Sequence, residues 1–191
     1  MLYLNDQQVA FLLGDAEENR RVLAQAFIDE YQAQAAQLTR QRIEAQGIKL
    51  STLAAVIPNQ GIAGAKVYTT IQGRFTFAII LFCTKTGAVL AVMDANEITK
   101  KRTAACSVLM AQCFANPNST TLSVFGLGAQ GTEHVLQFAQ AYSFECIYLV
   151  SVTSNQEKAH RLSTELNTKV VEASPQLALE QADILITASR A

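Results

Sequence analysis

The chain has no tryptophan and few charged residues. Charged side chains make up 16% of its 191 residues, whereas about 25% is usual for a soluble domain. The formal net charge is −1, so the sequence offers no electrostatic attraction to nucleic acid or to an anionic membrane, and we expect neither partner. The shortage of charge indicates that part of the surface is covered by a partner subunit or by further sequence.

Metal-binding patterns are also absent from the sequence. The four cysteines, Cys83, Cys106, Cys113 and Cys146, form no Cys-x-x-Cys pair, and the two histidines, His134 and His160, stand alone. Structural zinc needs clustered ligands. We therefore expect no metal, and we interpret the cysteines as buried, reduced thiols of a cytoplasmic protein.

Long apolar runs are missing as well. The longest, Phe75 to Cys83, is far shorter than the roughly 20 residues that span a bilayer. Polar Asn5 and Asp6 stand where a signal peptide would be apolar. The sequence therefore predicts a cytoplasmic protein that does not enter the membrane.

Residues 1–46 have a helical pattern. Asn5 is suited to cap a short helix that ends near Gly14, and a second helix is expected from about Asp15 to Leu38.

From residue 48 to 94 the pattern changes to short segments rich in β-branched and aromatic residues, separated by glycine and proline. Thr84–Gly87 is typical of a hairpin turn. A mostly antiparallel sheet is expected here. Its predicted strands are Leu50–Ile57, Ala65–Ile71, Phe75–Cys83 and Gly87–Met93.

A helix is then expected from Lys100 to about Ala115, capped by Thr99 and stopped by Asn116-Pro117. We place a domain boundary after it, which gives an α+β substrate and dimerisation domain over 1–117 and a second domain over 118–191.

Lys100, Lys101 and Arg102 fall in the first turn of this predicted helix. Cations at that end oppose the helix dipole by a few tenths to about 1 kcal/mol each. Their presence indicates that an anion docks there. The alternative is a solvated and locally unfavourable run of charge.

Residues 118–191 alternate strands with helices, which predicts a parallel sheet and about half of a doubly wound, Rossmann-type fold. The expected strands are Thr121–Phe125, Cys146–Val152, Lys169–Ala173 and Asp183–Thr187. Helices are expected from Gly126 to about Tyr142, over Asn155–Leu166 and over Pro175–Gln181.

The strongest motif is Gly-x-Gly-x-x-Gly at residues 126–131, between the first of these strands and its helix. Gly126 permits a tight turn, Gly128 lets the backbone approach a pyrophosphate, and Gly131 lets helix and strand pack closely. The N–H groups at the helix start, including those of Ala129 and Gln130, would bind the phosphates. The motif therefore predicts NAD or NADP as cofactor. A glycine-rich turn without a ligand is the alternative.

The usual acidic residue for the ribose is expected at the end of the second strand. This sequence has Ser151, Val152, Thr153 and Ser154 there instead. No carboxylate of this segment repels a 2′-phosphate, so NADP stays at least as probable as NAD, and Ser151 is our candidate ribose contact. Lys158 and Arg161 are close in sequence but do not match the standard pattern.

Two groups of residues follow an order typical of one enzyme family. They are Thr86-Gly87-Ala88-Val89-Leu90-Ala91, Asp94, Ile98-Thr99 and Arg102-Thr103-Ala104-Ala105, and then Gly126-Leu127-Gly128-Ala129-Gln130. Together they resemble the ornithine cyclodeaminase/mu-crystallin family, most clearly from about residue 60 to 190. The resemblance implies an oxidoreductase or cyclodeaminase that binds NAD or NADP and a small amino acid or cyclic imine, usually as a homodimer.

The resemblance also implies roles for single residues. Arg102 would bind the substrate carboxylate, Lys66 would lie near the substrate, and Arg42 would be a second carboxylate-binding arginine. Thr76 would lie near the nicotinamide, and Thr103 would take part in cofactor binding. The segment Thr187-Ala188-Ser189 would line the cofactor.

The family's aspartate at the substrate amine corresponds to no residue of this sequence, so we identify no catalytic residue. We expect a truncated gene, a split chain or a fragment, with little activity as given. The alternatives are a non-catalytic NAD(P)H-binding protein of the crystallin type and a degenerate remnant.

Overall fold

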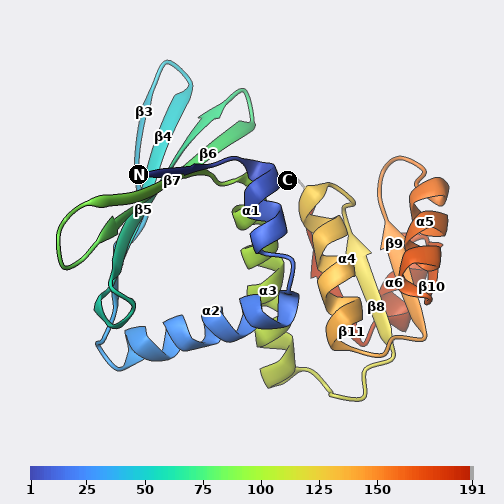
Figure 1. Ribbon diagram of the computed structural model, residues 1–191. Helices are drawn as coiled ribbons and strands as arrows, with labels where there is room; N and C mark the ends of the chain where they lie inside the picture. The colour runs from blue at the N-terminus through green and yellow to red at the C-terminus, as the bar shows by residue number, and fades with distance from the viewer. Residues whose placement is uncertain (190–191) are drawn as a thin grey trace. The chain divides into compact units, whose positions relative to one another are not determined.

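The structure is a computed structural model that describes residues 1–189 (Figure 1). By its internal contacts the chain divides into two compact units, Met1–Thr99 and residues 100 onward. The division falls inside helix α3 (Asn96–Phe114), ahead of the predicted boundary after residue 117. It does so because Val108 of this helix is buried in the core of the second unit.

The first unit is built on one sheet whose strands run in the order β1-β7-β6-β5-β4-β2, with β3 paired to β4. Within residues 1–99, neighbouring strands of this sheet are antiparallel, except that β1 is parallel to β7. The predicted antiparallel sheet and the hairpin turn before β7 are thereby confirmed. The strands are β1 (Leu2–Leu4), β2 (Ala36–Gln37), β3 (Gln41–Ala45), β4 (Ile48–Ile57), β5 (Ile62–Ile71), β6 (Arg74–Cys83) and β7 (Val89–Asp94), with the 3₁₀ turn η1 (Pro58–Gln60) between β4 and β5.

The helical prediction for residues 1–46 is only partly right. Helix α1 (Asp6–Leu12) has Asn5 as its N-cap, and α2 (Ala16–Tyr31) is capped by Asp15. However, α2 ends before Leu38, and β2 and β3 follow it. Residues 32–46 are rich in glutamine and alanine, a composition that favours helix locally. However, β3 pairs residue by residue with β4 across a tight turn, and this pairing outweighs the local preference.

The predicted start of α3 at Lys100 is wrong. The helix begins at Asn96, so the three cations lie beyond its first turn. Asp6 supplies the anion at its N-terminus, because one carboxylate oxygen accepts hydrogen bonds from the main-chain N–H groups of Asn96 and Glu97, each at 3.1 Å. The helix dipole is thus satisfied by the chain's own carboxylate.

The second unit is a parallel sheet in the order β10-β9-β8-β11, as residues 100–189 form it. This order is half of a doubly wound Rossmann-type sheet, as predicted. Its core is formed by Leu122, Val124, Phe138, Ile147 and Leu149. The elements are β8 (Thr121–Phe125), α4 (Ala129–Ala141), β9 (Cys146–Val150), α5 (Gln156–Leu166), β10 (Lys169–Glu172), α6 (Pro175–Gln181) and β11 (Ile184–Thr187).

The four cysteines are free thiols. Cys146 is buried, Cys83 and Cys106 are partly buried and Cys113 is exposed, so the expectation that all of them are buried holds fully only for Cys146 and is wrong for Cys113. Among the described residues, no helix combines the length and hydropathy needed to cross a bilayer.

Candidate functional site

The glycine-rich turn joins β8 to α4, and its first glycine is required by packing. Gly126 has a φ of +93°, and a Cβ there would lie 2.6 Å from the nitrogen of Ser189. The N–H of Ala188 donates to the oxygen of Phe125 at 2.7 Å. Thr187, the last residue of β11, pairs with Phe125. The segment expected to line the cofactor therefore lies against the turn.

The other two glycines differ in what surrounds them. A Cβ on Gly131 would overlap the carbonyl oxygen of Gly126, so the protein's own packing requires glycine there. A Cβ on Gly128 would meet no atom of residues 1–189 within 4 Å, and Gly128 is exposed. The space that the second glycine keeps open is thus available to a ligand, which fits the role that the motif assigns to it.

The start of α4 is suited to an anion. Gly128 is the N-cap, and no side chain of the described residues caps it. The first N–H groups of the helix, including those of Ala129 and Gln130, lack the intrahelical acceptors that later turns have. The side-chain oxygen of Gln130 is buried without a hydrogen-bond partner among residues 1–189. The N–H groups of this first turn and the positive end of the dipole together favour a phosphate, whereas the Gln130 side-chain oxygen is an acceptor and does not contribute.

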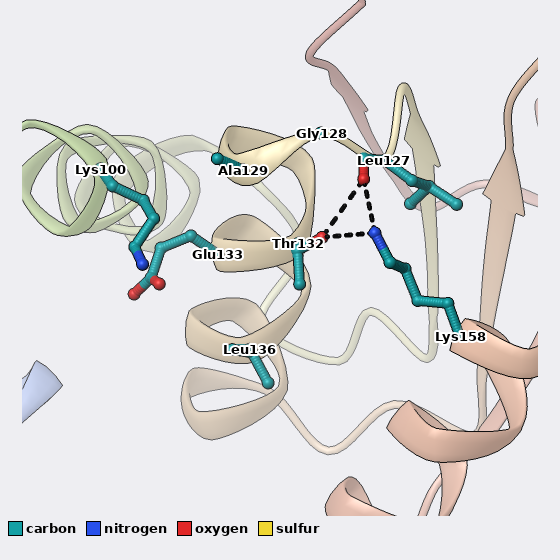
Figure 2. A pocket seen from close by; sticks show the side chains of 8 residues that line it. All are labelled: Lys100, Leu127, Gly128, Ala129, Thr132, Glu133, Leu136 and Lys158. Atoms are coloured by element: carbon teal, nitrogen blue, oxygen red, sulfur yellow. Dashed lines mark hydrogen bonds between the residues drawn. The ribbon is translucent and has the colours of Figure 1, made fainter. Parts of the chain in front are cut away.

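A cavity of about 320 Å³ opens at this turn. Figure 2 shows the side chain of Lys158 reaching from α5 to the turn. Its ammonium nitrogen lies 2.7 Å from the oxygen of Leu127 and 3.4 Å from the hydroxyl of Thr132. A cation from the second βα unit therefore stands beside the candidate phosphate site. The cavity is lined by Lys100, Leu127, Gly128, Ala129, Thr132, Glu133, Leu136 and Lys158.

The basic residues of α3 have different surroundings. Figure 2 shows the side chains of Lys100 and Glu133 pointing toward one another. Glu133 is buried and also accepts a hydrogen bond from the side chain of Gln137 at 2.8 Å. Arg102 is exposed on α3, and Thr103 is partly buried.

The loop after β9 holds Ser151 in a closed network. The hydroxyl of Ser151 donates to the oxygen of Thr153 and accepts from the side-chain amide of Asn155, both at 2.5 Å. Its hydroxyl proton is already used, so Ser151 would contact a ribose only as an acceptor.

A second cluster lies on one face of the sheet in the first unit. The Nε of Arg42 donates to the Ser51 hydroxyl at 2.9 Å, and a terminal nitrogen of Arg42 lies 3.4 Å from the Tyr68 hydroxyl. The ammonium of Lys66 lies 5.8 Å from the centre of the Tyr68 ring and 5.3 Å from that of Phe77. The strand pairing thus brings the two candidate substrate cations together around one buried tyrosine.

The charges of this cluster act on Tyr68. Burial alone would raise the pKa of its hydroxyl, but the hydrogen bonds with Ser51 and Arg42 and the positive charges of Arg40 and Arg42 outweigh it and lower that pKa. The site is therefore electropositive, which suits a carboxylate ligand.

Thr76 is not part of this cluster. It pairs with Thr69, and alternation along the strands places both on the opposite face from Tyr68. Thr76 is exposed there.

Comparison with known proteins agrees with these features. The model of the ornithine cyclodeaminase/mu-crystallin family matches residues 40–191. The chain belongs to this family. It is 35% identical over 115 residues to ketimine reductase mu-crystallin of Mus musculus, a match over 60% of this chain and 36% of that protein. It is 29% identical over 154 residues to Delta(1)-pyrroline-2-carboxylate reductase of Bacillus thuringiensis, over 78% of this chain and 44% of that protein.

Solved structures share the fold. A probable ornithine cyclodeaminase from Bordetella pertussis superimposes with a TM-score of 0.94 and 43% identity, over 100% of this chain and 61% of that one. The Delta(1)-pyrroline-2-carboxylate reductase of Thermococcus litoralis, solved with NADH and L-proline, gives 0.88 and 24% identity, over 99% of this chain and 62% of that one. This chain therefore spans less than two thirds of the length of these relatives.

The tyrosine at the centre of the second cluster was missed in the sequence. Tyr68 stands two residues after Lys66 in a strand, and residues at this spacing share a face. The signal was present, but many tyrosines in strands only pack, so spacing alone did not single it out.

Proposed function

We propose that this chain binds NAD or NADP at the turn formed by residues 126–131 and that it belongs to a reductase or cyclodeaminase acting on a small amino acid or cyclic imine. The observation that supports this best is the space left open at Gly128, in front of uncapped N–H groups and beside Lys158. In relatives, the reported ligands and substrates include NADH with L-proline, and L-lysine. We expect a substrate of that class here.

The residues of this chain would bind and orient the ligands. The α4 N-terminus would hold the pyrophosphate, and Thr187 and Thr103 would line the cofactor. Arg42, Lys66 and Arg102 would neutralise the substrate carboxylate, for which the fork of an arginine is well shaped. The nicotinamide, when bound, supplies hydride transfer, and the protein contributes orientation.

Isothermal titration of the purified chain with NADH and with NADPH tests the proposal. Gly128→Val should lower the affinity at least about tenfold, because two branched methyl groups would fill the space that a pyrophosphate needs. Ser143→Val, in the exposed loop after α4, is the matched control and should bind as the wild type does. A wild type that does not bind either dinucleotide would refute the proposal.

We also propose that the chain forms a homodimer through the uncovered face of its first sheet. Five large apolar side chains share that face by strand pairing and are 39–72% exposed. They are Ile43, Ile48, Leu50, Val56 and Ile71. Exposed apolar area of this kind marks an interface. Light scattering should give twice the chain mass, and Leu50→Glu should give a monomer, whereas Leu179→Glu, at an exposed leucine on α6 and away from this sheet, is the control.

We expect the 191 residues by themselves to show little turnover, because the aspartate that the resemblance assigns to the substrate amine falls on no residue of this sequence. Turnover of an amino acid or cyclic imine at the rates of full-length relatives would refute this. Binding without turnover, even after a C-terminal half is supplied, would favour a non-catalytic NAD(P)H-binding protein.

A further inference from the structure

The loop that follows β9 contains no carboxylate of its own, yet a carboxylate lies against it. In Rossmann-type folds this loop lies beside the adenosine ribose, and an acidic residue there distinguishes NAD from NADP. Glu172, the last residue of β10, pairs with Leu149 of β9. The neighbouring strand therefore brings to this loop the acid that its own sequence lacks.

The carboxylate of Glu172 is held by the loop through two donors. The Ser154 hydroxyl donates to one of its oxygens at 3.1 Å, and the N–H of Asn155 donates to the other at 3.3 Å. Asn155 is the N-cap of α5. The positive end of the α5 dipole thus faces the Glu172 carboxylate.

These contacts decide what the loop can bind. A 2′-phosphate carries a charge near −2 and needs hydroxyl, main-chain N–H or cationic donors. Here the hydroxyl of Ser154 and the N–H of Asn155 already donate to an anion. A second anion beside Glu172 would be repelled. A ribose 2′-hydroxyl is neutral, and it can donate to a carboxylate.

Lys158, in the first turn of α5, does not offset the negative charge of Glu172. The ammonium of Lys158 donates to Leu127 at 2.7 Å, which places it at the glycine-rich turn. We propose that Glu172 makes this site select NAD(H) over NADP(H). The inference rests on the proposed dinucleotide site and names its cofactor.

Titration calorimetry with ADP-ribose and with 2′-phospho-ADP-ribose tests the inference on the full chain. Both probes carry the adenosine and pyrophosphate groups and differ only at the 2′ position. Wild type should bind ADP-ribose at least about tenfold more tightly, since the 2′-phosphate and the Glu172 carboxylate repel one another. Glu172→Gln, which is nearly the same shape, should reduce this ratio about tenfold, mainly through tighter binding of the phosphorylated probe.

Glu180→Gln is the matched control. Glu180 is exposed on α6, where it accepts from Gln176, so the substitution makes the same change in net charge away from the loop. It should leave the ratio unchanged. Glu172→Ala serves as a second variant if Glu172→Gln does not fold.

Three results would overturn the inference. The ratio could stay unchanged in both Glu172 variants, or the wild type could prefer the phosphorylated probe. In either case the dinucleotide site itself would stand. If wild type bound neither probe, the proposed function would fail together with this inference. The failure of the selectivity alone can thus be distinguished from the failure of the dinucleotide site.

Discussion

The side-chain nitrogen of Lys158 lies 2.7 Å from the main-chain oxygen of Leu127. This bond joins the second βα unit to the turn of the first. Leu127 stands between Gly126 and Gly128, so the hydrogen bond fixes the turn at the point where a pyrophosphate would approach. Lys158 therefore both holds the turn and adds positive charge to it.

Lys158→Met should weaken NADH binding by about fivefold to tenfold, because it removes the cation and the bond to Leu127 while keeping the length of the side chain. Isothermal titration at fixed salt measures the change. Lys169→Met, at the exposed start of β10, makes the same change in charge away from the turn and should have little effect. Equal weakening in both variants would mean that only net charge matters.

Gly131→Ala and Gly128→Ala should separate folding from binding. The first puts a methyl group onto the carbonyl of Gly126 and should lower the free energy of unfolding by at least about 2 kcal/mol. The second places its methyl group in open space. It should leave the urea midpoint nearly unchanged but weaken NADH binding several-fold. A Gly128→Ala protein that binds like wild type would show that no ligand approaches this glycine.

Asp183 should make stability depend on pH in the acid range. Its carboxylate accepts from the N–H groups of Thr120 and Thr121, at 2.8 and 2.9 Å, and from the Thr121 hydroxyl at 2.9 Å. These hydrogen bonds hold the pKa of Asp183 below its ordinary value of 3.8. Because the folded pKa is the lower one, the stabilisation is present above the unfolded pKa and is lost as pH falls through the folded pKa.

The check is a pair of melting curves for wild type and Asp183→Asn over a range of pH. The wild type should be more stable by a constant margin near neutral pH, and the margin should shrink below about pH 4. Glu180→Gln serves as the control for an exposed carboxylate. A margin that does not change with pH would show that the carboxylate charge of Asp183 contributes nothing.

Tyr68→Phe should weaken carboxylate binding without unfolding the first unit. The ring that lies under Lys66 stays, and only the hydroxyl beside Arg42 is lost, so we expect about threefold weaker binding of L-proline by NMR titration. Arg42→Met should abolish measurable binding, because it removes the charge itself. Arg74→Met, at the exposed start of β6, is the control. If the control and Arg42→Met gave the same result, the proposed carboxylate site would be wrong.

Local patterns in the sequence were sufficient for much of the fold. Asn5 and Asp15 cap the helices that follow them, because capping depends on neighbouring residues. The alternation of strands and helices after residue 120 predicted the parallel sheet, because each strand and helix could be recognised from neighbouring residues. The glycine-rich turn could be placed between strand and helix because its pattern lies within one short segment, but the packing of Ala188 and Ser189 against Gly126 could not.

Other features depended on contacts between distant segments. The residues of β3 have the composition of a helix and became a strand only because β4 lies beside them. The start of α3 was misplaced because its cap is Asp6, ninety residues away in the chain. Strand pairing alone put Arg42, Lys66 and Tyr68 in one cluster and left Thr76 on the other face.

The sequence by itself determined that this chain has a Gly-x-Gly-x-x-Gly turn between a strand and a helix, and that it resembles one family, since both patterns lie in residues close together. Only the tertiary structure decided what surrounds that turn. It brought Lys158 to Leu127 and Glu172 to the loop after β9. Each of these contacts joins residues of different βα units, and a parallel sheet must form before such residues can meet.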